Sequence, residues 1–213
     1  MLNFTGNQNE INPNPNNCCG GFALAAVINQ LNLTGGLPAL VLPSHGITGF
    51  IAGKDTANNK LGARTYEAIQ NIQNNYGEGG AQENFVNNAA IIVDGTRRSL
   101  PSAIVITAIM TGISAANITV NYNKVELLAL GFPSNVINAE VNMLRSLGVT
   151  VNNIKDLAYD APEDGEFDII LCNDGAHWIS DDAAAYYNPH DGTNDNPLAG
   201  ISGIFSDLYI RIS

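Results

Sequence analysis

Residues 12–32 read NPNPNNCCGGFALAAVINQLN and indicate where the fold is organised. Two prolines favour an extended approach to a pair of adjacent cysteines. Apolar residues then recur at the spacing of one helical face, at Leu24, Val27, Ile28 and Leu31. The glycine pair at 35–36 ends this pattern. We therefore expect a helix over residues 19–32, with Cys19 in its first turn.

The position of Cys19 favours reactivity. A thiol acts as a nucleophile when it is ionised, and the positive end of a helix dipole stabilises the thiolate. Gly20 and Gly21 leave room for a substrate beside it. The alternative is a buried structural thiol. Cys18 is expected to pack in the core, or to form a strained, reducible pair with Cys19.

Three further helices are expected before residue 150. Apolar spacing predicts them over residues 61–77, 99–112 and 134–148. In the second of these, Ser99 is a candidate N-cap and Pro101 lies in the first turn. Residues 116–123 read as a strand.

The chain changes character after residue 148. Short extended segments recur at 149–154, 166–173, 176–182, 183–188 and 207–213, which predicts an antiparallel sheet. Helices first and strands later are typical of an α+β fold. We expect one domain over residues 1–213, with a helical subdomain at about 19–148 and a β-rich subdomain at about 149–213.

The segment GAHWISDDAAAYYNPHDG, residues 175–192, reads as a hairpin. A turn between Asp182 and Ala183 would set His177 directly opposite Asn188, at about 4.5–5.5 Å between Cβ atoms. An amide oxygen at that distance can hold an imidazole in one tautomer. Asp191 is the alternative orienting residue. Trp178 would point to the other face and anchor the strand in the core or shield the His–Asn bond.

The remaining cysteine and histidines have simpler interpretations. Cys172 lies in an apolar run and reads as a small buried hydrophobe. His45 is expected in a loop, although it is also a rival general base. His190 is expected in the turn or at a substrate-facing rim.

These two segments together resemble a known family. CGGFAL, residues 19–24, is similar to the start of the first helix in papain-like cysteine peptidases, especially the bacterial double-glycine leader peptidases. AHWI and YYNPHDG are similar to the histidine strand of that family and to its later turn. Asn188 stands where the bacterial group often has Asp, and papain itself has Asn there. About 25 of the 213 residues carry the resemblance.

The resemblance implies a papain-like fold with the nucleophile at a helix N-terminus packed on the sheet. Cys19 would be the nucleophile, His177 the general base and acid, and Asn188 the orienting residue. The family also has an oxyanion-binding Gln six positions before its cysteine. This chain has Pro13 there; the nearby amides are Asn12 and Asn14, with Gln8 further away, and Asn14 is the candidate donor.

The implied activity is that of a cysteine peptidase or amidase that cleaves a peptide or amide bond through a thioester. Two alternatives stay open: a deamidase or transglutaminase-like acyltransferase effector, and a catalytically inactive papain-like binding module. No cofactor is expected. The cysteines and histidines lack zinc-ligand spacing, so no metal is expected either.

Charge and hydropathy restrict the classes of molecule that we expect as partners. The chain carries 20 acidic against 9 basic residues, for a net charge of −11, and the basic residues are scattered. This disfavours nucleic acid or an anionic membrane as a partner and leaves a peptide or protein substrate. No apolar run is long enough to span a membrane, and no secretory signal is visible. Cytoplasmic location and export by a non-Sec route are both compatible with the sequence, and it leaves the oligomeric state open.

Overall fold

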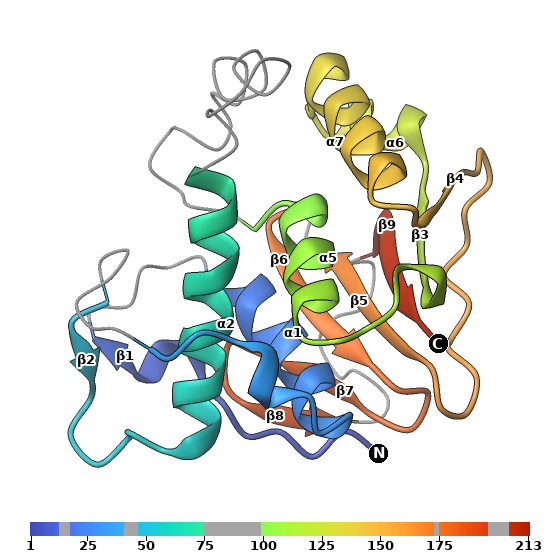
Figure 1. The fold of residues 1–213 in the computed structure, drawn as a ribbon. Helices are drawn as coiled ribbons and strands as arrows, with labels where there is room; N and C mark the ends of the chain where they lie inside the picture. The colour runs from blue at the N-terminus through green and yellow to red at the C-terminus, as the bar shows by residue number, and fades with distance from the viewer. Residues whose placement is uncertain (13–17, 41–46, 75–98, 173–174, 196–204) are drawn as a thin grey trace.

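The structure is a computed structural model that describes the chain outside residues 13–17, 41–46, 75–98, 173–174 and 196–204 (Figure 1). Its α-helices are α1 Cys19–Gln30, α2 Ala57–Asn74, α5 Pro101–Met110, α6 Lys124–Ala129 and α7 Ser134–Ser146. Short 3-10 turns lie at η1 Gln8–Glu10, η2 Thr34–Gly36 and η5 Ala115–Asn117. The strands are β1 Ile11–Asn12, β2 Gly49–Phe50, β3 Ile118–Tyr122, β4 Thr150–Asn153, β5 Phe167–Cys172, β6 His177–Asp181, β7 Tyr186–Asn188, β8 Thr193–Asp195 and β9 Phe205–Ile212.

One large mixed sheet dominates the described residues. Its strand order is β4-β3-β9-β5-β6-β7-β8, and β3 pairs with β4 in parallel while the other pairs are antiparallel. The fold therefore combines helices with a large mixed sheet, as the α+β class requires. The purely antiparallel sheet that the sequence suggested is wrong. The connection from β3 to β4 runs through α6 and α7, which supply the long crossover that a parallel pair needs. β3 therefore belongs to the sheet although it lies within residues 19–148, where a helical subdomain was expected.

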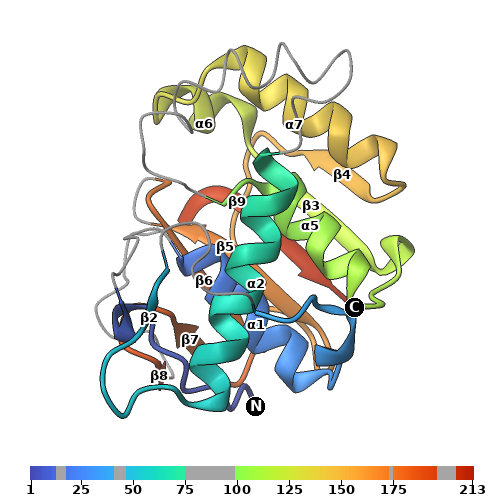
Figure 2. The ribbon, with the colours of Figure 1, turned by 60° about the vertical axis from the view of Figure 1, so that its left-hand side comes forward.

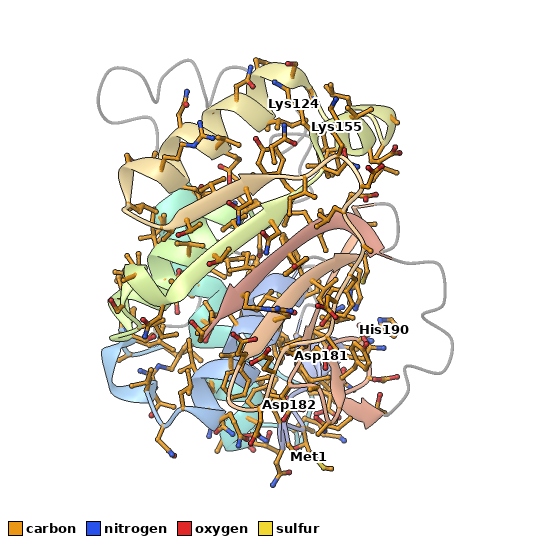
Figure 3. The ribbon with its side chains drawn as sticks, turned by 90° about the vertical axis from the view of Figure 1, so that its right-hand side faces the viewer. Met1, Lys124, Lys155, Asp181, Asp182 and His190 are labelled. Carbon is orange, nitrogen blue, oxygen red and sulfur yellow. The ribbon has the colours of Figure 1, made fainter. Side chains whose placement is uncertain are left out.

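The helices α1, α2 and α5 lie together on one face of this sheet (Figures 1 and 2). The view from the other side has the strands in front of these helices, with Lys124 and Lys155 near one end of the sheet and Asp181 and Asp182 toward the other (Figure 3). α1 packs against β5, β6, β7, α2 and α5. Every residue from Cys19 to Ile28 is buried, as expected of a helix that is apolar around most of its surface.

Glycines let α1 and α2 approach closely. A Cβ added to Gly21 would lie 2.5 Å from the Cα of Tyr66, which belongs to the α2 backbone. A Cβ on Gly62 would lie 2.4 Å from the ring of Phe22. Real Cβ atoms do not approach neighbours so closely, and therefore a side chain at either position would push the helices apart.

The expected helices are present with adjusted ends, except that residues 75–77 of the helix expected at 61–77 lie outside the described residues. The pattern at 19–32 forms α1, that at 134–148 forms α7, and the strand at 116–123 forms β3. The helix expected from residue 61 begins at Ala57, because Thr56 caps it: its Oγ1 accepts the N–H of Asn59 at 3.2 Å. The short β8 was not predicted. None of the helices in the described ranges is long and apolar enough to cross a membrane.

Ser99 was wrong as the N-cap of α5. Leu100 takes that position, with an extended backbone and no side-chain cap. A carboxylate from another helix replaces the missing cap, since Glu140 of α7 accepts from the Ser102 N–H and from its Oγ, each at 2.7 Å. Both helices are fixed to each other by this contact.

Candidate functional site

Cys19 is the first residue of α1, as the sequence predicted. Its exposed fraction is 6%. The first helical hydrogen bond runs from Phe22 N–H to the Cys18 carbonyl at 3.1 Å, so the amides of the first turn have no acceptor within the helix itself. Cys18 is fully buried at the N-cap and makes no side-chain cap bond there. All three cysteines lie in the described residues and are thiols, so the vicinal disulfide is not formed.

The start of α1 lies against Ser99 and Trp178. A Cβ on Gly20 would lie 2.4 Å from the Ser99 Cβ and 3.2 Å from Cδ1 of Trp178. The indole Nε1 donates to the Ser99 carbonyl at 3.1 Å, and Trp178 is buried. Trp178 therefore anchors β6 in the core, which is one of the two roles expected for it.

His177 and Asn188 are brought into contact. His177 Nε2 lies 3.0 Å from Asn188 Oδ1. The predicted register is nevertheless wrong: Asp181 pairs with Tyr186 and Ser180 with Tyr187, so a continued ladder sets Ile179 opposite Asn188. The observed register is displaced from the predicted one by an even number of residues. Because side chains alternate along a strand, His177 and Asn188 keep a common face and meet diagonally.

Hydrogen bonding fixes the tautomer of His177. Asn188 Oδ1 also accepts the backbone N–H of His190 at 3.0 Å, and a backbone N–H can only donate. The atom that faces His177 is therefore the amide oxygen, not the amide nitrogen. An oxygen acceptor requires the proton on Nε2, which leaves Nδ1 with a lone pair. The imidazole is thus held ready to accept a proton at Nδ1.

Burial keeps this imidazole neutral. Desolvation lowers the pKa of His177, the bond with Asn188 raises it, nearby His190 lowers it, and the charge of Asp191 raises it. The net direction is downward. A neutral imidazole at pH 7 is the form that a general base needs.

Cys19 and His177 converge on the same end of the sheet. His177 begins β6 and lies opposite Cys172, the last residue of β5. Burial and, to a smaller extent, the charge of Cys19 together raise the pKa of Cys172 to about 12. Cys19 also lines a cavity together with Ala176 and Trp178, the two neighbours of His177. Cys172 itself is buried, as predicted.

The rival residues take other places. Asp191 is exposed, and its Oδ1 accepts from the N–H of Thr193 at 3.1 Å and from its Oγ1 at 2.7 Å. His190 is exposed in the turn after β7, as expected, and its carbonyl accepts from Asn9 Nδ2 at 2.5 Å. His45 and Asn14 lie outside the described residues.

Gln8 lies beside the histidine–asparagine pair. Its N–H donates to the Pro189 carbonyl at 2.9 Å. The side chain is buried, and its Oε1 has no hydrogen-bond partner among the residues that the structure describes. Tyr187 donates to the Gly6 carbonyl at 2.6 Å. Burial raises the pKa of Tyr187 most, followed by the charge of Asp191 and then by the charge of Cys19. The segment before Cys19 therefore contributes a buried amide close to this site.

An apolar cavity of about 90 Å³ extends from Cys19 to the helices α6 and α7. Glu140 lines it and is buried. Burial raises the pKa of Glu140 to about 7, although its two hydrogen bonds from Ser102 lower it. The sequence interpretation missed this residue. The available signal was a glutamate inside the apolar face of α7, four residues after Val136 and four before Leu144.

No group of three or more metal-ligating side chains occurs in the part of the chain that the structure describes. Comparison with protein-family models, with curated proteins and with solved structures finds no match to this chain.

Proposed function

We propose that the protein is a cysteine hydrolase that cleaves a peptide or amide bond. Cys19 is the nucleophile, His177 the general base and acid, and Asn188 the residue that orients His177. The observation that carries this proposal is the bond from His177 Nε2–H to Asn188 Oδ1, on strands that pack against the helix headed by Cys19. That bond leaves Nδ1 as the basic nitrogen.

The reaction follows from these roles. Nδ1 of His177 removes the thiol proton, and the Cys19 sulfur attacks the carbonyl carbon of the substrate. The imidazolium then gives the proton to the leaving amine as the C–N bond breaks, which leaves a thioester on Cys19. Water, deprotonated by the same imidazole, hydrolyses the thioester and restores the thiol. An amine in place of water gives acyl transfer from the same intermediate.

Two groups are candidates to stabilise the oxyanion. The first is the backbone N–H of Cys19 at the helix N-terminus. The second is a side-chain amide from the preceding segment. Gln8 is our candidate among the described residues, because its side chain is buried in the segment that bonds to Pro189, next to Asn188, and its Nε2–H₂ group is the type of donor that an oxyanion needs.

The test uses the full-length chain with a panel of peptide and simple amide substrates, and liquid chromatography with mass spectrometry detects the products. Cys19→Ala and His177→Ala should each abolish turnover of a responsive substrate, and Asn188→Ala should reduce it less. Gln8→Ala should lower kcat with little change in KM, because an oxyanion contact forms in the transition state. Full activity of Cys19→Ala removes the proposal.

A further inference from the structure

The cavity beside Cys19 crosses the sheet. Four adjacent strands contribute to its lining, in the order Trp178 of β6, Leu171 of β5, Leu208 of β9 and Tyr122 of β3. Neighbouring strands lie about 4.8 Å apart, so the lining extends roughly 14 Å away from the Cys19 end. The cavity is therefore an elongated slot.

The lining of the slot is suited to a neutral aliphatic group. Leu127 of α6 and Val141 of α7 cover it from the helical side, and no lysine, arginine or histidine is among the described residues that line it. The carboxylate of Glu140 already accepts two hydrogen bonds from Ser102. An anionic ligand would lose its hydration without gaining a partner of opposite charge, and a cationic one would meet only Glu140, whose two oxygens already accept from Ser102.

One polar group at the Cys19 end is unsatisfied. Ser99 lines the slot and is 5% exposed, and its Oγ has no hydrogen-bond partner within the described ranges of the chain. Its Cβ lies next to Gly20, so the hydroxyl is at the same end of the slot as the thiol. A buried hydroxyl without a partner costs free energy, which a polar atom of a bound ligand would recover.

We propose that the slot binds an aliphatic group of about four or more carbons on the acyl side of the bond that Cys19 attacks, and that Ser99 hydrogen-bonds a polar atom next to it. This inference rests on the proposed function. A cavity of about 150 Å³ accommodates benzene, so the 90 Å³ of this slot suits roughly four carbons. A fatty acyl chain and the side chain of a peptide residue share this chemistry.

The first experiment does not depend on turnover. Methyl, propyl and butyl methanethiosulfonates react with a thiolate to give the mixed disulfide and methanesulfinate. The rate at Cys19 is followed by peptide mass spectrometry and divided by the rate of N-acetylcysteine with the same reagent. Burial of three additional CH₂ groups should raise the normalised rate from methyl to butyl by up to about 60-fold.

Adjacent leucines of α6 give a matched pair of variants. Leu127 lines the slot, whereas Leu128 is 42% exposed and does not. Leu127→Phe should remove most of the chain-length dependence, and Leu128→Phe should keep it. Ile137→Val enlarges the slot without overpacking, and it should move the optimal chain length upward even if Leu127→Phe fails to fold.

The outcomes separate the two proposals. A flat chain-length profile in the wild type overturns the slot, whether or not amide turnover occurs. A steep profile that Leu127→Phe or Ile137→Val alters supports it, and a protein with that profile but without turnover refutes the hydrolase instead. With active enzyme, p-nitrophenyl butyrate and hexanoate are compared with leucine and norleucine p-nitroanilides. Faster turnover of the hexanoate ester than of the butyrate ester identifies an acyl chain as the ligand. Different rates for the two anilides identify an amino-acid side chain.

Discussion

Replacement of Asn188 by Ala should lower the pKa of His177. The Asn188 oxygen accepts from Nε2 of His177, and this bond is one of the influences that raise the His177 pKa against burial. A hydrogen bond to a charged group contributes about 1.5–3 kcal/mol, and one pKa unit corresponds to about 1.4 kcal/mol. The midpoint should therefore fall by about one to two pH units.

The assay is an NMR titration of the imidazole Cε1–H signals. The chain has three histidines, so His177→Gln assigns the relevant signal. Asn188→Asp is the paired variant, because it keeps an oxygen acceptor for His177 and for the His190 N–H and adds a negative charge. Its His177 midpoint should rise above that of the wild type.

Asn194→Ala is the control for loss of an asparagine near this site. Asn194 lies on the neighbouring strand β8 and donates to the Phe4 carbonyl at 2.9 Å. Its removal should affect stability and leave the His177 titration unchanged. An unchanged or raised midpoint in Asn188→Ala would refute the assignment of Asn188 as the partner of His177.

Three predictions concern the packing around the site. Gly21→Ala should lower the free energy of unfolding in urea by about 2 kcal/mol, because the added Cβ would clash with the Tyr66 backbone. Gly35→Ala is the control: its Cβ would have no atom within 4 Å, so the free energy of unfolding should change by no more than about 0.5 kcal/mol. Equal effects of the two substitutions would contradict the close helix contact. Because the Glu140 pKa is raised from 4.5 to about 7, the folded state retains a proton that the unfolded state releases, so stability falls as pH rises through this window, by about 3 kcal/mol from this group. Glu140→Gln should remove that part of the decline in urea titrations at pH 4.5 and pH 7.5, and an unchanged decline would contradict it. Trp178→Phe leaves the Ser99 carbonyl without its buried donor and should cost about 1–3 kcal/mol, measured as a lower Tm; an unchanged Tm would show that the bond contributes nothing.

Local patterns predicted the elements that hold the candidate site. The apolar spacing after Cys19 gave α1, and that around Val141 gave α7. The contact between His177 and Asn188 was anticipated although the register was not. It survives because a shift by an even number of residues keeps the same face.

The register depended on turn geometry that the pattern does not contain. Ala183 has a positive φ of 65°, and its N–H is accepted by Asp181 Oδ1 at 2.9 Å. Asp182 Oδ1 accepts the N–H groups of Ala184 and Ala185 at 3.1 and 2.8 Å. These side-chain bonds move the turn toward the alanines.

Contacts between residues far apart in the chain could also not be predicted from the sequence. β3 joins the sheet next to β9, whose residues lie some 90 positions later, and no local pattern encodes such a pairing. The role of Glu140 depends on the approach of α7 to the start of α5. The slot beside Cys19 likewise exists only after four strands and the helices α1, α5, α6 and α7 have packed.

The most direct test of the central claim is the pH dependence of Cys19 alkylation. The native protein is treated with limiting iodoacetamide between pH 5 and pH 9, and the modified fractions of Cys18, Cys19 and Cys172 are determined by peptide mass spectrometry. If His177 activates Cys19, the wild-type midpoint lies at least one unit below the ordinary thiol value of about 8.5, and His177→Ala moves it upward. Identical profiles for the two proteins, with slow labelling of Cys19 at pH 6 in both, would contradict the account.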